Sequence, residues 1–482
     1  MSTLNKLEPK QVFRYFEEIS AVPRASYNTK LIADYLEEFA KSRNLDYYRD
    51  QYDNIVIRKA ATSGYECAAP IILQGHSDMV AEKTADSNHD FASEGLELIV
   101  DGDLLKANKT TLGGDDGIAV AIGLALLDDD KIEHPALEIL ITSNEEVGLL
   151  GATSFDTSYL HGKKMINLDS EEEGVLLAGC AGGVSIHSIL SGKHHHENNN
   201  KFEMTISGLK GGHSGMEINK NRANANALMG RLLHTLNGQI EYSLAHISGG
   251  EKDNVITPAA TAIILTDSDK GKVLETIATT LQQELRKEYG GCDEGITISI
   301  ADLGEEKAAV LDSATKEKVI FFLMNAPFGV HKMSGEIDGL VETSSNIGVV
   351  KSISQGVEVV CSVRSMVASA KEALAEQIKY LTEFLGGEYQ IEGDYPAWEF
   401  SEISPLRDTL TKEYQKMFGD EMKVAAIHAG LECGIFYDKM PDLDCVSIGP
   451  NIYDVHSPNE HLSISSTERM WKYLLKVLEA LK

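Results

Sequence analysis

Five histidine and carboxylate residues, with one adjacent glutamate, have the types and the order of a site for two metal ions. The five are His76, Asp115, Glu146, Asp169 and His456, and the adjacent residue is Glu145. Nitrogen and carboxylate ligands without thiolates suit zinc, manganese or cobalt. Five protein ligands are too many for one catalytic zinc ion, which normally has three. Two metal ions that share one carboxylate are therefore the simpler prediction.

Most of these residues follow short apolar runs that we expect to be buried strands. The runs and the residues that follow them are 70–74 with His76, 136–142 with Glu145 and Glu146, and 164–168 with Asp169. Polar residues beyond the carboxyl ends of strands converge on one crevice in an open α/β sheet. Each motif alone is usually an ordinary turn or a solvated pair. The whole set in this order predicts an active site.

Asp115 is the best candidate for the shared carboxylate. It lies in the glycine-rich segment 113–117, directly before an alanine-rich helix expected over 118–127. Flanking glycines let the backbone approach closely and adopt an unusual conformation. We expect the neighbouring Asp116 to orient the turn.

The pair Glu145 and Glu146 predicts one ligand and one free carboxylate, because adjacent residues of an extended chain point in opposite directions. A free carboxylate beside a metal-bridged water is a natural general base for attack on a carbonyl, and it can pass the proton to a departing amine. The expected reaction is amide or peptide hydrolysis. Asp78, two residues after His76, is placed to accept a hydrogen bond from the second ring nitrogen, and its alternative role is a turn cap.

The composition argues against nucleic acid and membranes as partners. The 482 residues include 74 Asp plus Glu against 44 Lys plus Arg, which gives a formal net charge of -30. This charge disfavours nucleic acid and anionic membrane surfaces. No apolar signal region and no membrane-spanning stretch are recognisable, so we expect a cytoplasmic protein. The six cysteines are scattered without a C-x-x-C pair, which indicates neither a disulfide framework nor a thiolate zinc site.

The spacing of the candidate ligands predicts an inserted domain. His456 lies 287 positions after Asp169 (456 minus 169), so the intervening chain must leave the site and return. A chain of this length is also too long for one simple core. We therefore predict an insert over 184–393 and a discontinuous catalytic domain formed by 1–183 and 394–482.

Alternating strand and helix patterns predict an α+β layer for the insert. Its expected strands are 202–206, 240–242, 261–265 and 357–363, and its expected helices are 223–236, 272–287, 313–323 and 371–385. A strand at 443–448 and a helix at 466–481 would complete the catalytic domain. The hydrophilic run 194–200, with three consecutive histidines, is expected to be an exposed hairpin tip and is assigned no role.

The motifs resemble those of the co-catalytic zinc exopeptidase family, which includes carnosinase, glutamate carboxypeptidase and tripeptidase T. The shared signatures are Gly75–Asp78, Gly114–Gly117, Asn144–Gly148, Leu168–Asp169 and His456–Glu460. Within this family, the branch that cleaves aminoacyl-histidine dipeptides looks most similar. Segments particular to that branch are 180–183, 210–215 and 428–434.

The resemblance implies a mixed, mostly parallel sheet with helices on both faces, and an inserted α+β lid domain. It implies two zinc ions, with cobalt or manganese as alternatives, held by His76, Asp115, Glu146, Asp169 and His456. It also implies Glu145 as general base, Asp78 as an orienting residue and a cis peptide after Asp115. His461 competes with His456 for the last ligand position, but the pattern His-x-x-Asn-Glu favours His456.

The resemblance also implies substrate contacts from the lid and a homodimer. His213 is the candidate contact to the substrate or the oxyanion, and Asn254 and Arg364 are further candidates. An arginine can hold a C-terminal carboxylate through a bidentate pair. For His213, the alternative is that the residue only fills a tight glycine-rich loop.

The expected function is metal-dependent hydrolysis of short peptides, and the resemblance implies dipeptides with a C-terminal histidine, such as β-alanyl-histidine. Two alternatives use the same metal chemistry: removal of an acyl group from an amino acid and cleavage of a tripeptide. A more distant alternative is a relative that binds metal without catalysis. The intact Glu145 argues against it, because a protein that only binds metal needs no spare carboxylate beside a full ligand set.

Overall fold

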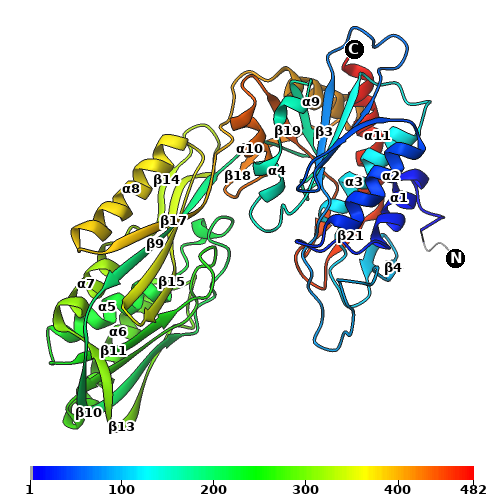
Figure 1. Cartoon of the computed structure of the whole chain (residues 1–482). Coiled ribbons are helices and arrows are strands. Elements are labelled where there is room, and N and C mark those ends of the chain that lie inside the picture. Colours follow the sequence, from blue (N-terminus) through cyan, green and yellow to red (C-terminus); the bar gives the residue numbers. More distant parts are fainter. Residues whose placement is uncertain (1–3) are drawn as a thin grey trace. The chain divides into compact units, whose positions relative to one another are not determined.

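The computed structural model describes residues 4–482, and contacts within the chain divide it into two compact units (Figure 1). The first unit contains the chain up to Cys180, together with Trp398–Ala426 and Leu431–Lys482. The second unit contains Ala181–Ala397 and Ile427–Gly430. The predicted insert, 184–393, lies inside the second unit, which also takes in the short segment 427–430. No helix among residues 4–482 is long and apolar enough to cross a membrane.

The first unit is built on a mixed eight-stranded sheet whose centre is parallel. Strands β6, β3, β7 and β19 are parallel neighbours in that order, whereas the pairs β1–β2, β2–β6 and β19–β8 are antiparallel. Strands β3, β6 and β7 confirm the three apolar runs that the sequence predicted. The strand order is β1 (Asp46–Arg49), β2 (Ile55–Lys59), β6 (Leu137–Thr142), β3 (Ile71–His76), β7 (Lys164–Asn167), β19 (Asp444–Ser447), β8 (Val175–Cys180) and β18 (Lys423–Ile427).

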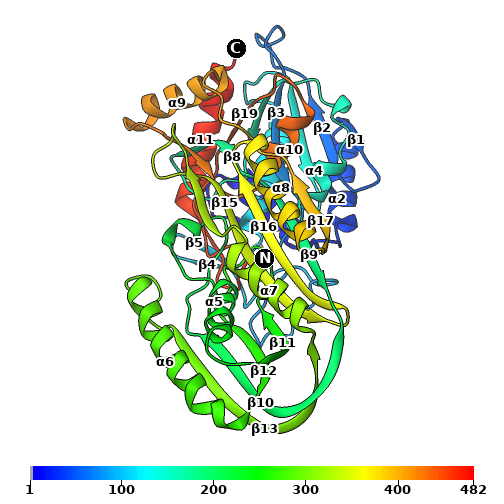
Figure 2. The same ribbon diagram turned by 90° about the vertical axis from the view of Figure 1, so that its left-hand side faces the viewer.

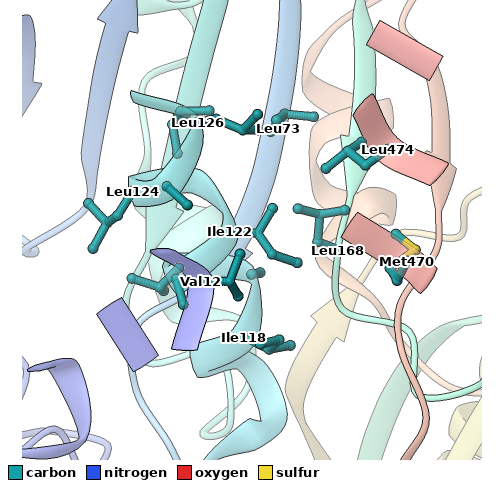
Figure 3. Close-up of a cluster of buried hydrophobic side chains, with 14 of the residues drawn as sticks. Val12, Leu73, Ile118, Ile122, Leu124, Leu126, Leu168, Met470 and Leu474 are labelled. Atoms are coloured by element: carbon teal, nitrogen blue, oxygen red, sulfur yellow. The ribbon is translucent and has the colours of Figure 1, made fainter. Parts of the chain in front are cut away.

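Helices cover both faces of this sheet, as expected. Leu73, Ile139 and Ile166 point to one face and share a core with helices α1 (Lys10–Ser20), α2 (Lys30–Ser42), α3 (Gly114–Asp128), α9 (Pro405–Phe418) and α11 (Ile464–Ala480). Figure 3 shows part of this core, where Leu73 lies among side chains of α3. The short helices α4 (Leu150–Ser154) and α10 (Glu432–Lys439) pack together on the other face (Figure 1).

A small four-stranded sheet joins segments that are far apart in the sequence. Its order is β20 (Ile452–Tyr453), β21 (His461–Ser463), β5 (Leu104–Ala107) and β4 (Leu98–Asp101). The loop between β20 and β21 carries His456. This sheet therefore brings the C-terminal ligand candidate back to the chain that precedes Asp115.

The second unit is an α+β layer, as predicted. A nine-stranded sheet packs one face against helices α5 (Ala225–Asn237), α6 (Gly271–Glu288), α7 (Ser313–Asn325) and α8 (Ala368–Phe384) (Figure 2). All strand pairs described in this sheet are antiparallel. The strand order is β13 (Thr297–Leu311), β10 (His194–Ser207), β12 (Ala260–Thr266), β11 (Ser243–Gly249), β15 (Val341–Ile353), β16 (Gly356–Ser365), β9 (Gly182–Ser191) and β17 (Glu388–Tyr395), and β14 (Gly329–Met333) pairs with β15. Short 3-10 turns span Thr157–Tyr159, Ile218–Lys220 and Ser268–Lys270.

The hairpin tip predicted at the histidine run is wrong. His194–His196 begin strand β10 and pair with Ala309–Leu311 of β13, although their side chains are exposed. Gly192 and Lys193, just before them, connect β9 to β10, and these two strands are not neighbours in the sheet. This polar run forms a strand because it pairs with β13. Strand formation depends more on context than on the intrinsic preference of each residue.

Candidate metal centre

The structure brings the six predicted side chains together at one edge of the first unit's sheet. His76 is the last residue of β3, Glu145 and Glu146 follow β6, and Asp169 follows β7. Asp115 lies at the start of α3, and His456 comes from the β20–β21 loop. Parallel neighbours end at the same edge of a sheet, which explains why residues so far apart in sequence meet there.

Asp115 lies between the two histidines. Its Oδ1 lies 3.1 Å from His76 Nε2, and its Oδ2 lies 3.1 Å from His456 Nε2. His456 Nε2 is also 3.0 Å from Glu146 Oε2, and His76 Nε2 is 3.6 Å from Asp169 Oδ1. The cluster therefore consists of two groups of potential ligands that share one carboxylate.

The two histidines are held in a strongly negative environment. Burial alone would lower the pKa of His76, but hydrogen bonds with Asp115, Asp169 and Asp78 outweigh burial and raise it well above its usual value. Hydrogen bonds with Asp115 and Glu146 raise the pKa of His456 to about 11. Carboxylates that favour a proton on an imidazole also favour a divalent cation beside it, and a metal ion competes with the proton for the same nitrogen.

The cluster contains more carboxylates than nearby cationic side chains that could pair with them. Burial raises the pKa of Glu145 well above its usual value, and burial raises the pKa of Asp169 to about 7. Buried Glu146 Oε1 and Asp116 Oδ1 have no hydrogen-bond partner among the described residues. Buried negative charge is costly unless it is paired. The donor set thus fits divalent cations, of the kind that nitrogen and oxygen ligands bind.

The peptide between Asp115 and Asp116 is cis, as the resemblance implied. The carboxylate of Asp116 turns back to accept a hydrogen bond from the backbone N–H of His76 at 3.1 Å. Gly113, just before this segment, has a φ of 63°, in the left-handed region that glycine adopts without strain. Asp116 therefore ties the start of α3 to the end of β3.

Asp78 lies where an orienting residue is expected. Its Oδ1 accepts a hydrogen bond from the backbone N–H of Glu145 at 3.0 Å and lies 3.4 Å from His76 Nδ1. Its Oδ2 accepts a hydrogen bond from the Ser26 hydroxyl at 2.8 Å. The nearest acceptor for His76 Nδ1 is the backbone carbonyl of Asp78, at 3.1 Å. Asp78 thus links the loop of His76 to the loop of Glu145.

Two further charged residues hold the glycine-rich loop of Asp115. Buried Arg24 donates hydrogen bonds to the carbonyls of Ser77, Asp78 and Gly113. The carboxylate of Glu460 accepts hydrogen bonds from the backbone N–H groups of Leu112, Gly113, Gly114 and Asp115, at 2.8, 3.0, 2.7 and 3.3 Å. The sequence flagged Glu460 only as part of a motif, and no pattern flagged Arg24.

His461 does not join the cluster. Its Nδ1 lies 2.8 Å from the carbonyl of Asn459, and its ring stacks on Tyr453. The structure therefore brings His456 to Asp115, and His461 remains in the small sheet.

His213 and Asn254, two of the predicted substrate contacts, lie side by side in the second unit. His213 forms a β-bridge with Val255, and its Nδ1 accepts hydrogen bonds from the backbone N–H groups that follow, including that of Met216 at 3.0 Å. The carbonyl of Asn254 accepts a hydrogen bond from the N–H of Ser214 at 2.8 Å. The buried Oδ1 of Asn254 has no partner among the described residues.

Arg364, the third predicted contact, lies in β16 of the second unit and donates a hydrogen bond to the Tyr395 hydroxyl at 2.6 Å. Its positive charge also influences His428, a residue that the sequence patterns did not single out individually. Burial, and then the positive charge of Arg364, lower the pKa of His428 to about 3. His428 Nε2 lies 2.7 Å from the Ser344 hydroxyl, so a neutral imidazole is held beside the guanidinium.

An α/β sheet that carries two groups of potential ligands sharing an aspartate is the arrangement expected of a hydrolase with a dinuclear metal centre. The sequence agrees with this class: residues 72–480 match the model of Peptidase family M20/M25/M40. The chain belongs to this family and is a peptide hydrolase of the dipeptidase type. The resemblance drawn from the motifs is confirmed.

Two relatives match almost the entire chain. The cytosol non-specific dipeptidase of Escherichia coli (strain K12) is 36% identical over 485 residues, which cover 99% of each chain. The solved structure of aminoacylhistidine dipeptidase from Vibrio alginolyticus has a TM-score of 0.88 at 32% identity and covers 99% of this chain and 98% of that chain. Aminopeptidase PepT from Bacillus cereus shares the fold with a TM-score of 0.56 at 12% identity, with 98% and 99% covered.

Proposed function

We propose that this protein hydrolyses dipeptides at two divalent metal ions. The proposed ligands are His76 and Asp169 for one ion, His456 and Glu146 for the other, and Asp115 for both. The main support for this proposal is the position of Asp115, whose two carboxylate oxygens each lie 3.1 Å from a different histidine. We propose zinc as the ion, with cobalt or manganese as substitutes, because these ligands accept all three.

Bound metal ions would polarise the scissile carbonyl and make water acidic enough to be a nucleophile near neutral pH. Glu145 supplies the proton transfer: its Oε2 lies 4.0 Å from His76 Nε2, inside the cluster. It takes the proton from the attacking water and gives it to the departing amine. Asp78 fixes the loop of Glu145 through the hydrogen bond to its backbone N–H. The other cluster carboxylates remain free to bind the ions.

We propose that dipeptides with a C-terminal histidine are among the substrates. Support comes from the names of the two full-length relatives, one an aminoacylhistidine dipeptidase and the other a non-specific dipeptidase. His213, Asn254 and Arg364 are the proposed substrate contacts, and the guanidinium of Arg364 suits a C-terminal carboxylate. The buried Oδ1 of Asn254 is an acceptor that lacks a partner among the described residues and suits a substrate N–H.

We further propose a cytoplasmic homodimer formed through the second unit. Helix α8 exposes 70% of Tyr380 and 73% of Phe384, one helical turn apart, beside the edge strand β17. An exposed apolar pair next to a free strand edge favours association. Sedimentation of wild type and of a Tyr380→Lys/Phe384→Lys variant tests this proposal. We expect wild type to be a dimer and the variant to be a monomer. Phe321→Lys, at an exposed side chain of α7, is the matched control, and a monomeric wild type contradicts the proposal.

The test of the reaction is hydrolysis of β-alanyl-histidine and a panel of other dipeptides by the metal-loaded protein, beside a Glu145→Ala variant of known metal content. We expect wild type to cleave histidine-terminated dipeptides. The variant should keep two ions and lose roughly 10²- to 10⁴-fold in kcat, the usual contribution of a general base. Cleavage only of acylated amino acids or of tripeptides would replace the proposed substrate class. A metal-loaded protein without any hydrolytic activity would overturn the reaction itself.

A further inference from the structure

Four buried polar side chains form a chain of hydrogen bonds across the centre of the first unit's sheet. Asn167 Nδ2 donates to Gln74 Oε1 at 2.7 Å, and Gln74 Nε2 donates to the carboxylate of Glu432. The Thr142 hydroxyl lies 2.6 Å from the same Glu432 oxygen. All four side chains are almost completely shielded from solvent. Glu432 is the first residue of α10, where the positive end of the helix dipole favours a carboxylate.

Each strand residue of this chain lies just before a residue of the proposed centre. Gln74 precedes His76 by two positions in β3, Thr142 ends β6 three positions before Glu145, and Asn167 ends β7 two positions before Asp169. Residues two apart in a strand point to the same face, so Gln74 lies below His76. The hydrogen bonds therefore connect the three parallel strands immediately beneath the ligand layer.

We infer that Glu432 is a positioning residue of the metal centre, which fixes the spacing of the strand ends that carry His76, Glu145 and Asp169. This inference rests on the proposed centre and goes beyond it. Three strands that are neighbours only through backbone hydrogen bonds can still shift at their ends. One carboxylate that accepts from both β3 and β6, and reaches β7 through Gln74 and Asn167, holds their side chains in one register.

The hydrogen bonding of Glu432 differs from that of a purely structural carboxylate. Both described donors address Oε2, whereas Glu432 Oε1 and the neighbouring Asn167 Oδ1 are buried acceptors without a partner among residues 4–482. Glu138, on the same face and in β6, instead accepts at both oxygens, from His161, Gly162 and Arg58. Incompletely satisfied buried groups concentrate at functional places. Glu138 is therefore a matched control for Glu432.

The experiment compares zinc titration of the metal-free protein by calorimetry for wild type, Glu432→Ala, Glu432→Gln and Glu138→Ala. The absorption spectrum of the cobalt-loaded protein reports ligand geometry independently of activity. We expect Glu432→Ala to bind zinc about 10- to 100-fold more weakly, as for other residues that orient ligands, with an altered cobalt spectrum and a lower kcat at similar KM. Glu432→Gln should recover most of this, because its carbonyl can accept both hydrogen bonds. Glu138→Ala should titrate like wild type.

Wild-type zinc affinity and cobalt spectrum in Glu432→Ala would overturn the inference, as would equal weakening in Glu138→Ala. If Glu432→Ala does not fold, Thr142→Val removes one of the two donors without changing the side-chain shape. It should weaken zinc binding by a smaller factor, and an unchanged affinity would overturn the inference. A wild type that binds two ions but cleaves no peptide would contradict the proposed function alone. The zinc affinities of wild type and the Glu432 variants could still be compared, so the inference would remain tested.

Discussion

The central strands of the first unit have buried carboxylates near both ends. The carboxylates at the two ends differ in how fully the protein's own groups satisfy them. At the amino end, Glu138 accepts hydrogen bonds from the backbone N–H groups of His161 and Gly162, from the His161 ring and from Arg58. Asp128, a partly exposed carboxylate at the far end of α3 from Asp115, pairs with Arg14 at 2.7 Å and Arg43 at 2.6 Å. Protein donors and cations fully satisfy these groups.

At the carboxyl end, the carboxylates outnumber their partners. Glu146, Asp116 and Glu432 each leave a buried oxygen without a partner among the described residues. An unsatisfied buried acceptor costs about 1–3 kcal/mol. The amino end shows that this fold can satisfy buried carboxylates with its own groups. The difference between the ends therefore indicates where a cation from outside the chain belongs.

The largest expected effect comes from removing the shared ligand. Asp115→Asn withdraws the charge that both histidines contact, so we expect loss of both ions and a fall in kcat of about 10³-fold or more, corresponding to several kcal/mol of transition-state stabilisation. Metal analysis and dipeptide hydrolysis measure the two effects. Asp128→Asn, at the opposite end of α3, should keep both ions. Two ions retained by Asp115→Asn would break the comparison between the ends.

A smaller effect is expected at Asp78, which touches the loops rather than an ion. Asp78→Asn keeps the shape but weakens the hydrogen bonds to the Glu145 N–H and to Ser26. We expect kcat to fall roughly 10- to 100-fold, in the range of residues that orient metal ligands, while two ions remain bound. Steady-state kinetics with parallel metal analysis checks this. A variant with wild-type kcat would show that the loop needs no such support.

The proposed ligands could be selected from the sequence because most of them have a local signal. His76, Glu146 and Asp169 follow apolar runs, and Asp115 lies among glycines, so a short window of sequence reveals each of them. Arg24 has no such signal, and Glu432 was included only in the segment 428–434 of the resemblance, without a role of its own. Arg24 acts through backbone carbonyls up to 89 positions away, and Glu432 contacts a side chain 358 positions away. A pattern within one segment does not encode contacts over such separations.

The same distinction holds for the fold. The apolar runs of β3, β6 and β7 are buried on both faces, so composition alone identified them. Strand β13 was not predicted, because most of its 15 residues are exposed and several are charged. It forms by pairing with β10, whose own start is polar. Strand pairing of this kind is set by neighbours in space, which sequence patterns reveal only where one face is apolar.

At the amino end of the strands, we expect a loss of stability without a loss of function. Glu138→Gln removes the charge that His161 and Arg58 share while keeping the side-chain volume. Because buried hydrogen bonds would then be left mismatched, the free energy of unfolding should fall by about 1–3 kcal/mol. Denaturant unfolding measures it, and zinc affinity and kcat should stay within about twofold of wild type, since no ligand is touched. A large fall in kcat would mean that the two ends are not separable.

The smallest expected effect is the pH dependence of Asp128. Burial would raise the pKa of this carboxyl, but hydrogen bonds with Tyr15, Arg43 and Arg14 outweigh burial and lower it to about 2. The unfolded-state value is near 3.9, so its contribution to stability is complete above about pH 4 and is lost as the pH falls toward 2. Full linkage would give about 2.5 kcal/mol, and partial exposure reduces this to about 1–2 kcal/mol. Thermal unfolding of wild type and Asp128→Asn should therefore differ at pH 7 and converge near pH 2. A difference that persists at pH 2 would assign the effect to packing instead of charge.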